Sequence, residues 1–516
     1  MTVGRLTRAA AVVAVFGLIS RLLGFVREAV LAAAFGASAA ADAFVSSLLL
    51  VNSVAAVLLY TLVTLVIPVF QQEREDRGSD SAWALLAALA AWVGAILLVI
   101  AGIAALWPEG PAALFGFEDE RADQTAELVR IMAPAIMLQG FSALFTAMLQ
   151  VHGKFAGPAA VGVAFNFGII VGVLVGQETI GIEAAAWGVA AGATLQVLLQ
   201  LPQFIRLLRR NGVRPRIYHP RLAWVGAMAL PVLAASILQQ INNFTDKYFA
   251  GTLESGRVAA LSFANALGQA PRAALLIPIM TPLFPEIARM VAERREEGVG
   301  RAFGRAAGLL ALVAAPIAAL LAVYSHEAAQ IAFGRGQCDA SCVDEIASPL
   351  RFYGIALWAG FISYLCNRTL SAGNQTRQIM TVTTITVVLT IALDLVFLGP
   401  FEQAGLALAT AIALYVQAIL LLAFLHMRFQ TLVPTRLIEQ QGRIAVSTAV
   451  AVAVALGLNL LIDTTSGPSG EVALLAGLKV AVAMAAYLAV ARLLSPSEVA
   501  DGRQALARLA SRPGRR

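Results

Sequence analysis

The chain has 516 residues, of which 59% are hydrophobic and 13% are charged, and its formal net charge is +6. Soluble domains contain about 25% charged residues, so a water-soluble fold could not cover this much apolar surface. The composition excludes a soluble enzyme, a disordered chain and an ordinary nucleic-acid binder, and we expect no nucleic-acid partner. It indicates a protein embedded in a membrane.

Fourteen apolar segments are each long enough to cross a bilayer, which takes about 20 residues of helix. The connections between them are short, so no soluble domain is inserted. The first segment could be read as a signal peptide, but charged residues interrupt it and further apolar segments follow. We predict an all-α polytopic membrane protein with about 14 transmembrane helices, at approximately 9–35, 42–70, 82–107, 124–151, 158–176, 184–207, 222–249, 257–285, 304–324, 347–370, 379–398, 403–426, 444–462 and 471–494.

The distribution of Lys and Arg predicts the orientation of these segments. With the N-terminus in the cytoplasm, the inside loops hold 25 basic residues and the outside loops hold 3, namely Arg121, Arg257 and Arg335. Cytoplasmic loops of membrane proteins have such an excess. We therefore expect both termini to be cytoplasmic.

The first segment contains three ionisable residues within its apolar run, Arg21, Arg27 and Glu28. Such residues are costly inside a membrane and indicate a functional site. One explanation is the wall of a cationic cavity for an anionic group such as phosphate, because arginine offers a bidentate fork. The alternative is an internal pair between arginine and glutamate.

The seventh and eleventh segments each combine an acidic residue with hydroxyl or amide side chains. Asp246 follows Asn243, while Asp394 follows Thr386 and Thr390 at a spacing of four residues, which places them on one helical face. Such oxygens suit a hard monovalent cation or a proton relay. The alternative is two acids that are hydrogen-bonded separately.

The eighth segment has Arg272 near its middle, directly after Pro271. An arginine in mid-membrane on a proline-broken helix is tolerated best where it faces a water-filled cavity. We therefore include Arg272 in the candidate cationic site.

Cys338 and Cys342 lie four residues apart in a predicted outside loop. An exported pair could form a disulfide, while free thiols or a weak metal contact are the alternatives. A disulfide would staple this loop and take no part in chemistry.

The chain also resembles itself at an offset of about 219 residues, since Glu183 and Glu402 begin similar stretches. An offset of six helices predicts two six-helix lobes in parallel repeat, an arrangement that places a substrate site between the lobes. The alternative is a chance alignment of apolar stretches. We predict an N-terminal lobe at 1–215, a C-terminal lobe at 216–430, two extra helices at 431–495 and a basic cytoplasmic tail at 496–516.

Four stretches share one resemblance. The most specific is SRLLGFVREAVLAAAFGASAAADAF at 20–44, and the others begin at Val129, Thr245 and Phe397. In order, over about 1–430, they resemble the MurJ/MviN family of lipid II flippases in the multidrug/oligosaccharidyl-lipid/polysaccharide exporter superfamily.

This resemblance implies a V-shaped pair of lobes, and two extra helices that form a groove for a lipid tail. Family positions in the central cavity correspond to Arg21, Arg27 and Asp42, with the arginines facing a pyrophosphate. The family's sodium site corresponds to Asp246, Asp394, Thr410, the Leu406 carbonyl and Thr390, which stands where an asparagine is usual.

The chain departs from the family pattern at Ala55 and Ala266, where the family usually has arginine. Arg272, a few residues beyond Ala266, could partly replace one of these cations. The departures bear on the identity of the substrate and leave the transporter class intact.

We predict a flippase that moves lipid II, a peptidoglycan precursor, across the bacterial inner membrane by alternating access coupled to membrane potential and a cation. Its expected partners are this lipid-linked glycan, membrane lipids and cell-wall synthesis proteins. No catalytic signature such as GxSxG, HExxH or a P-loop occurs in the sequence, so we expect no enzyme and no cofactor other than Na⁺. The alternatives are an exporter of another polyprenyl-linked polysaccharide and a transport-dead membrane scaffold for cell-wall enzymes.

Overall fold

The computed structural model describes residues 3–211, 216–293, 295–429, 434–462 and 469–510. All regular secondary structure in these residues is helical, which confirms the predicted all-α class. The packing of the helices divides the chain into two compact units, Met1–Ala259 and Ala260–Arg516. The predicted lobes rest on a sequence repeat that this division by packing does not test, so the repeat stays a prediction.

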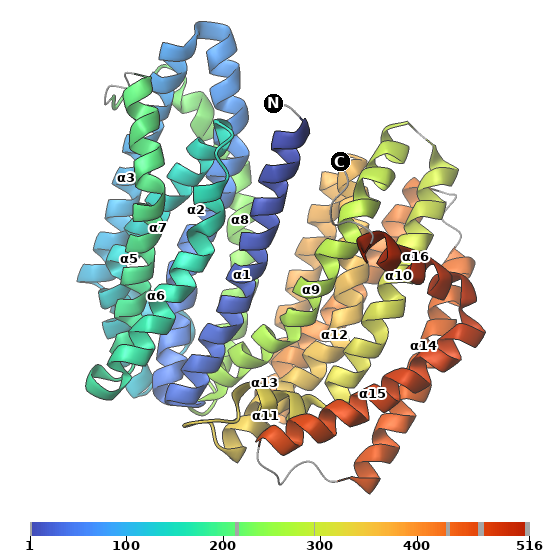
Figure 1. The fold of residues 1–516 in the computed structure, drawn as a ribbon. Helices are drawn as coiled ribbons and strands as arrows, with labels where there is room; N and C mark the ends of the chain where they lie inside the picture. Colours follow the sequence, from blue (N-terminus) through green and yellow to red (C-terminus); the bar gives the residue numbers. More distant parts are fainter. Residues whose placement is uncertain (1–2, 212–215, 294, 430–433, 463–468, 511–516) are drawn as a thin grey trace. The chain divides into compact units, whose positions relative to one another are not determined.

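Unit 1 is a bundle of long helices with two short ones at a connection (Figure 1). Its elements are α1 (Val3–Phe35), α2 (Ala39–Arg77), α3 (Ser79–Leu106), α4 (Glu109–Ala112), the 3₁₀ helix η1 (Ala113–Phe115), α5 (Glu120–Val151), α6 (Ala156–Ile180), α7 (Glu183–Arg210) and α8 (Leu222–Gly251).

Glycines allow α6 and α7 to pack backbone against backbone. A Cβ placed on Gly168 of α6 would lie 2.4 Å from the Cα of Gly192 on α7, and one on Gly192 would lie 2.6 Å from the Phe165 carbonyl oxygen. Helices in a membrane gain stability from such close van der Waals packing, because lipid offers no hydrophobic drive between them. These glycines therefore set the separation of the two helices.

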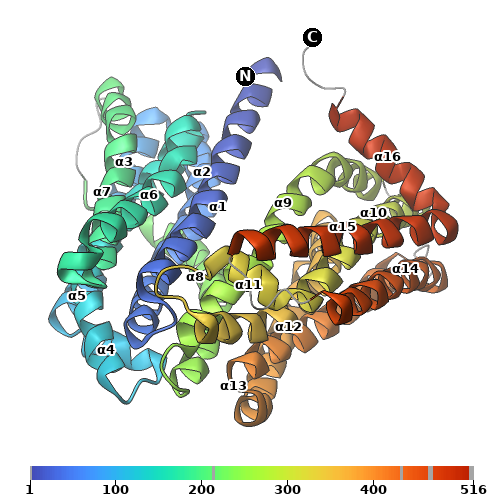
Figure 2. The ribbon, with the colours of Figure 1, turned by 60° about the horizontal axis from the view of Figure 1, so that its bottom comes forward.

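Unit 2 contains the remaining helices, and Figure 2 shows α14 and α15 beside each other. Its elements are α9 (Arg257–Ala292, whose first residues belong to unit 1), α10 (Glu296–Val323), α11 (Ser325–Phe333), α12 (Ala340–Ala372), α13 (Thr376–Arg428), α14 (Pro434–Leu461), α15 (Ser469–Leu494) and α16 (Pro496–Ala510). Its core forms where α10, α12 and α13 meet, around the buried side chains of Phe303, Phe361, Leu365 and Leu421.

Each predicted apolar segment lies within one of these helices, to within one residue at its end, and two of the segments share α13. With 53 residues, α13 would extend about 80 Å at the rise of an α-helix, well beyond a hydrocarbon core of about 30 Å. The helix is broken at Glu402, where φ is 50° and ψ is −133°. It therefore provides two spans, as the sequence predicts.

Ten helices of the described chain are long and apolar enough to cross a membrane. The helices α1, α9 and α12 are not in that set, and each contains ionisable residues. The protein is a multi-pass membrane protein. The short helices α4, η1 and α11 are not predicted from the sequence, and neither is α16, which forms in the basic tail.

Candidate functional site

The structure distributes the predicted site residues between the two units. Unit 1 holds Arg21, Arg27, Glu28, Asp42 and Asp246, while unit 2 holds Arg272, Thr390, Asp394, Leu406 and Thr410.

The predicted cationic wall on α1 is tied to α6. Arg27 forms an ion pair with Glu28, and its Nη1 donates a hydrogen bond of 3.0 Å to Oδ1 of Asn166. Asn166 in turn donates to the Ser20 carbonyl oxygen at 3.2 Å. The internal arginine–glutamate pair is therefore present, and Arg21, six residues before Arg27, is exposed.

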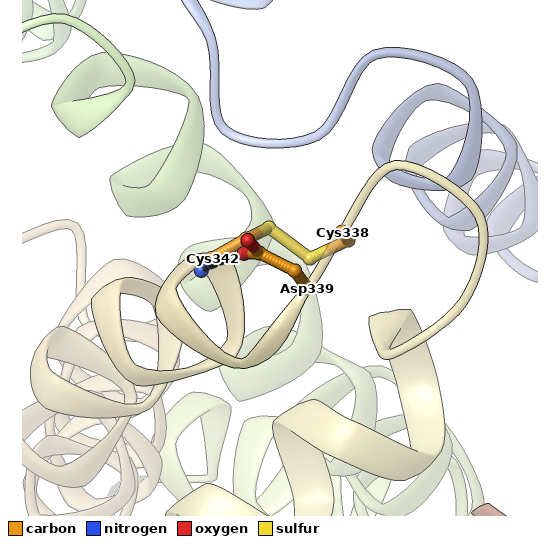
Figure 3. The surroundings of a disulfide bond; sticks show 3 residues. All are labelled: Cys338, Asp339 and Cys342. Carbon is orange, nitrogen blue, oxygen red and sulfur yellow. Dashed lines mark hydrogen bonds between the residues drawn. A yellow bond between two sulfur atoms is a disulfide. The ribbon is translucent and has the colours of Figure 1, made fainter.

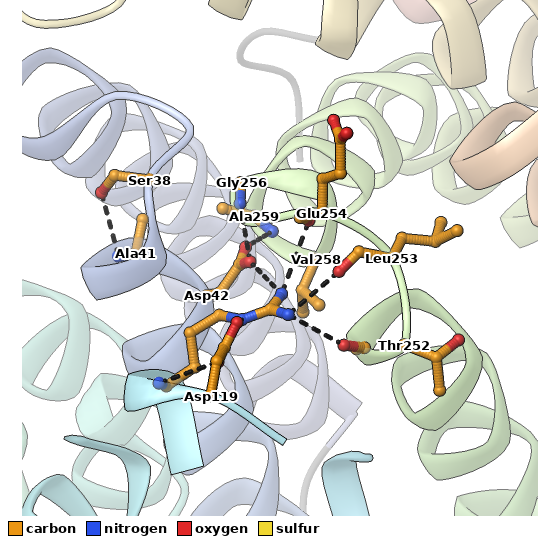
Figure 4. A network of polar contacts seen from close by, with 12 residues as sticks. Ser38, Ala41, Asp42, Asp119, Thr252, Leu253, Glu254, Gly256, Val258 and Ala259 are labelled. Carbon is orange, nitrogen blue, oxygen red and sulfur yellow. Dashed lines mark hydrogen bonds and ion pairs between the residues drawn. The ribbon is translucent and has the colours of Figure 1, made fainter. Parts of the chain in front are cut away.

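Asp42 lies at the centre of a buried network near the start of α2 (Figure 4). Its side chain is fully buried. Oδ1 accepts a hydrogen bond of 2.7 Å from the Ala259 amide, and Oδ2 accepts one of 2.7 Å from the Gly256 amide. Since these amides belong to the first turn of α9 and the residue before it, Asp42 caps that helix from another part of the chain.

Arg121 completes this network from the first turn of α5. Its Nη1 lies 3.2 Å from Oδ2 of Asp42, and its Nη2 donates to the carbonyl oxygens of Gly251 and Leu253 at 3.2 and 3.0 Å. These carbonyls follow the end of α8, where the helix leaves acceptors unsatisfied. The Asp42–Arg121 ion pair thus gives hydrogen-bond partners to carbonyl oxygens at the end of α8 and to amides at the start of α9.

Asp119 positions this arginine. It accepts a hydrogen bond from the Arg121 amide at 3.0 Å and another from its Nε at 2.9 Å. The hydrogen bond from the Arg121 side chain lowers the pKa of Asp119 below its usual value. In the sequence, Arg121 indicates only orientation, because Asp42 and Gly251 lie 79 and 130 residues away along the chain.

Arg272 projects from α9 toward α12, where a Cβ on Gly360 would lie 4.0 Å from its Nη1. No hydrogen bond or ion pair joins it to another residue of the described part of the chain, although its side chain is half-buried. An arginine on a membrane helix without an acidic partner is chemically suited to an anionic ligand.

Three of the residues predicted to hold a cation, Thr390, Asp394 and Leu406, are buried, whereas Thr410 and Asp246 are half-buried. In unit 2, Asp394 is fully buried and Thr390 is nearly so, with its hydroxyl donating to the Thr386 carbonyl oxygen at 2.9 Å. The hydroxyl of Thr410, on the other half of α13, is buried and has no hydrogen-bond partner among the described residues.

In unit 1, Oδ1 of Asp246 is likewise buried without a hydrogen-bond partner in the described chain. The neighbouring Lys247 directs its ammonium to the Val258 carbonyl oxygen at 3.0 Å. Within the described residues, no group of three or more His, Cys, Asp and Glu side chains converges. Within unit 2 alone, the carboxylate of Asp394, the hydroxyls of Thr390 and Thr410 and the Leu406 carbonyl offer the oxygen chemistry of a hard cation site.

Cys338 and Cys342 form a disulfide, with their Cα atoms 5.2 Å apart (Figure 3). Asp339 between them caps α12 by accepting a hydrogen bond of 3.0 Å from the Cys342 amide. Of the alternatives that the sequence left open, the disulfide is confirmed. The bond staples the loop before α12, and the third cysteine, Cys366, is buried within that helix.

A polar cluster that the sequence does not predict lies where α2 ends and α3 begins. Glu73 is fully buried, accepts a hydrogen bond of 2.5 Å from Ser81, and lies 3.0 Å from Nη1 of Arg221. His219 lies 3.7 Å from the same carboxylate. Burial lowers the pKa of His219 below its usual value. The cluster fastens the residues before α8 to the α2–α3 connection.

The chain is similar to known proteins over most of its length. The family model described as "Lipid II flippase MurJ" matches residues 31–476. A lipid II flippase MurJ of Burkholderia cenocepacia is 28% identical over 82% of this chain and 84% of its own length. A probable lipid II flippase MurJ of Rhizobium meliloti is 27% identical over 92% of this chain and 91% of its own.

The fold matches as well. A solved structure titled "Lipid II flippase MurJ, inward closed conformation" superposes with a TM-score of 0.81 at 18% identity, covering 94% of this chain and 99% of the other.

Proposed function

The chain belongs to the lipid II flippase MurJ family, and from that membership we propose that it moves lipid II from the inner to the outer leaflet of a bacterial cytoplasmic membrane. The proposed process is transport by alternating access, without a covalent reaction. Peptidoglycan synthesis would then supply the substrate on one face of the membrane and consume it on the other.

The observation that favours an anionic headgroup is Arg272. This half-buried arginine has no acidic partner in the described chain, and burying a guanidinium without a counter-charge is costly. A pyrophosphate would supply the missing negative charge through paired hydrogen bonds. Arg27, unlike Arg272, already has partners. To bind the pyrophosphate it would have to exchange its ion pair with Glu28 or its hydrogen bond to Asn166 for a contact with the ligand.

The Asp42–Arg121 network supplies a conformational latch for the proposed cycle. It fixes the last residues of unit 1, from which α9 continues into unit 2. Any rearrangement of α8 against α9 must either move this network as one body or break a buried ion pair. We propose that it holds the end of α8 and the start of α9 together during the cycle.

We further propose that Na⁺ binding biases the cycle. Asp394, Thr390, Thr410 and the Leu406 carbonyl, all in unit 2, would hold the ion. The buried hydroxyl of Thr410, which has no hydrogen-bond partner among the described residues, supports this proposal. A cation would stabilise only the conformation that it binds more tightly.

Depletion of the host's own flippase tests the function. Cells dependent on this chain should grow, and should stop growing when Arg272→Gln replaces it. Arg272→Lys should restore growth only in part, because the ammonium keeps the charge and loses the bidentate fork. Arg289→Gln, a substitution of an exposed arginine on the same helix, is the matched control.

Because Ala55 and Ala266 stand where the family usually has arginine, the growth test also has to cover a different substrate or a chain without transport. Growth failure by a well-folded, membrane-inserted wild type would favour another polyprenyl-linked glycan as substrate, or a scaffold without transport. Full activity of Arg272→Gln would remove this residue from headgroup binding.

A further inference from the structure

A polar cavity lies in unit 2, and its lining includes none of the residues proposed to bind lipid II or sodium. It forms where the first turns of α10, α14 and α16 meet and has a volume of about 590 Å³. This size falls within the range of about 300–1,000 Å³ that is typical of small-ligand sites. Its lining is unusual because four arginines and three glutamates face it.

Most of its negative charge is already engaged. Glu439 pairs with Arg443, and Glu498 accepts a hydrogen bond of 2.9 Å from Gln440. Hydrogen bonds from Ser497 and Gln440 lower the pKa of Glu498 against the effect of its burial, so this carboxylate stays ionised.

Two of the arginines have no such partner. Arg301 of α10 and Arg436 of α14 form no hydrogen bond or ion pair with any other described residue. Arg305 lies 3.5 Å from Asp501 of α16, which holds that helix beside the cavity. Glu297 is the one lining carboxylate without a partner in the described chain. The lining side chains without a partner, two arginines and one glutamate, therefore carry a net positive charge.

The helix ends add to this positive potential. The first-turn amides of α10 have no side-chain cap, and the amide end of a helix attracts anions. The interior is also open at Gly304, where a Cβ would meet no atom within 4 Å. A ligand can thus reach both unpartnered guanidinium groups.

From these observations we propose that the cavity binds the phosphate group of an anionic phospholipid. The excess of Lys and Arg assigns this end of α10 and α14 to the cytoplasmic face, so the lipid would come from the inner leaflet. Basic pockets between membrane helices at this level recognise anionic headgroups. The site is separate from the residues proposed for lipid II and would anchor α14 and α16 to α10.

The first test uses the purified full-length chain and short-chain phosphatidylglycerol, with short-chain phosphatidylcholine as the uncharged comparison. Native mass spectrometry measures the affinity. The wild type should prefer phosphatidylglycerol, and Arg301→Gln and Arg436→Gln should each weaken its binding about fivefold, which corresponds to about 1 kcal/mol per basic residue.

Three further variants separate a site from general surface attraction. Glu297→Gln should tighten binding, because it removes the unpaired carboxylate. Gly304→Leu should block binding without a change of charge. Arg289→Gln removes an equal charge from an exposed arginine outside the cavity and should have no effect. The proposal would be overturned if Arg289→Gln and Arg301→Gln lost the same affinity for phosphatidylglycerol. It would also be overturned if the wild type bound phosphatidylglycerol no more tightly than phosphatidylcholine.

Glycerol phosphate and inorganic phosphate distinguish the source of the anion. Either one binding as tightly as phosphatidylglycerol, with the same dependence on Arg301, would assign the cavity to a soluble phosphate compound and overturn the lipid assignment. Loss of lipid II transport in Arg272→Gln should leave phosphatidylglycerol binding intact. The two proposals can therefore fail separately.

Discussion

Asp42 accepts hydrogen bonds from two amides and lies against a guanidinium, so neither of its oxygens is spare. Asp42→Asn removes the charge and presents a donor where an acceptor is needed. Breaking a buried ion pair costs about 3–5 kcal/mol, and we expect a loss of this order in the free energy of unfolding. Chemical denaturation in detergent measures it, with Asp123→Asn at an exposed position on α5 as the control.

A double-mutant cycle with Arg121→Gln tests whether the latch acts as one unit. The double variant should lose less than the sum of the two single variants, with a coupling of about 0.5–3 kcal/mol. Additive losses would show that Asp42 and Arg121 stabilise unit 1 independently.

His219 gives a pH dependence to the contact between the residues before α8 and the α2–α3 connection. Burial, with the nearby charges of Arg77 and Arg221, lowers its pKa against the pull of Glu73. The unfolded chain, with a histidine pKa of about 6.5, then binds the proton before the folded chain does. Stability should fall as the pH drops through about 6.5.

His219→Gln should flatten this part of the stability curve, measured by thermal unfolding between neutral and mildly acidic pH. His426→Gln, at an exposed helix end, is the matched control. An unchanged slope in His219→Gln would assign the acid sensitivity to other groups.

At this scale the sequence could reveal ionisable residues that interrupt apolar segments, such as Arg27, Glu28 and Arg272. It also limited the state of Cys338 and Cys342 to a disulfide, free thiols or a weak metal contact. The sequence could not reveal that Arg121 and Glu73 are buried and paired. Both lie near the ends of apolar segments, where charged side chains normally face water. Only the fold brings their distant partners to them.

At the scale of the helix, hydrophobic runs locate the membrane segments well, since each must be apolar for about 20 residues. The two segments within α13 remain distinct because the backbone turns at Glu402. Gly405 allows this turn, since a Cβ there would lie 2.3 Å from the Phe397 carbonyl oxygen. By contrast, α16 is short and polar, and its helical structure depends on packing against α10 and α15.

The contact between α6 and α7 should tolerate no added atom. Gly168→Ala places a methyl group 2.4 Å from the Cα of Gly192, so the helices must separate. Overpacking of this kind costs about 1–3 kcal/mol. Unfolding in detergent should show this loss, whereas Gly102→Ala in α3, where a Cβ meets nothing within 4 Å, should be neutral or stabilising. Equal stability of the two variants would contradict the proposed close packing.

For the whole molecule, orientation follows from charge and is open to a direct test. A fluorescent protein fused after Arg516 should fold and fluoresce in the cytoplasm. Alkaline phosphatase inserted at Gly336, between α11 and α12, should be active outside. The excess of basic residues in alternate loops is the reason. Activity of the phosphatase after Arg516 instead would reverse the assigned faces, including that of the phosphate cavity.

The coupling ion is the property of the whole molecule that is most directly testable. If Na⁺ binds the folded chain and not the unfolded one, it raises the free energy of unfolding by about 2.7 kcal/mol at a concentration about 100 times its Kd. Thermal unfolding in NaCl and in KCl of equal ionic strength should therefore differ. Asp394→Asn should abolish the difference, because the neutral amide removes the charge that balances the ion, and Thr410→Val should reduce it. Asp344→Asn, an exposed acid on α12, should retain it. Equal stabilisation by both salts, unchanged in Asp394→Asn, would show that these residues form a proton relay or separate hydrogen bonds and hold no sodium ion.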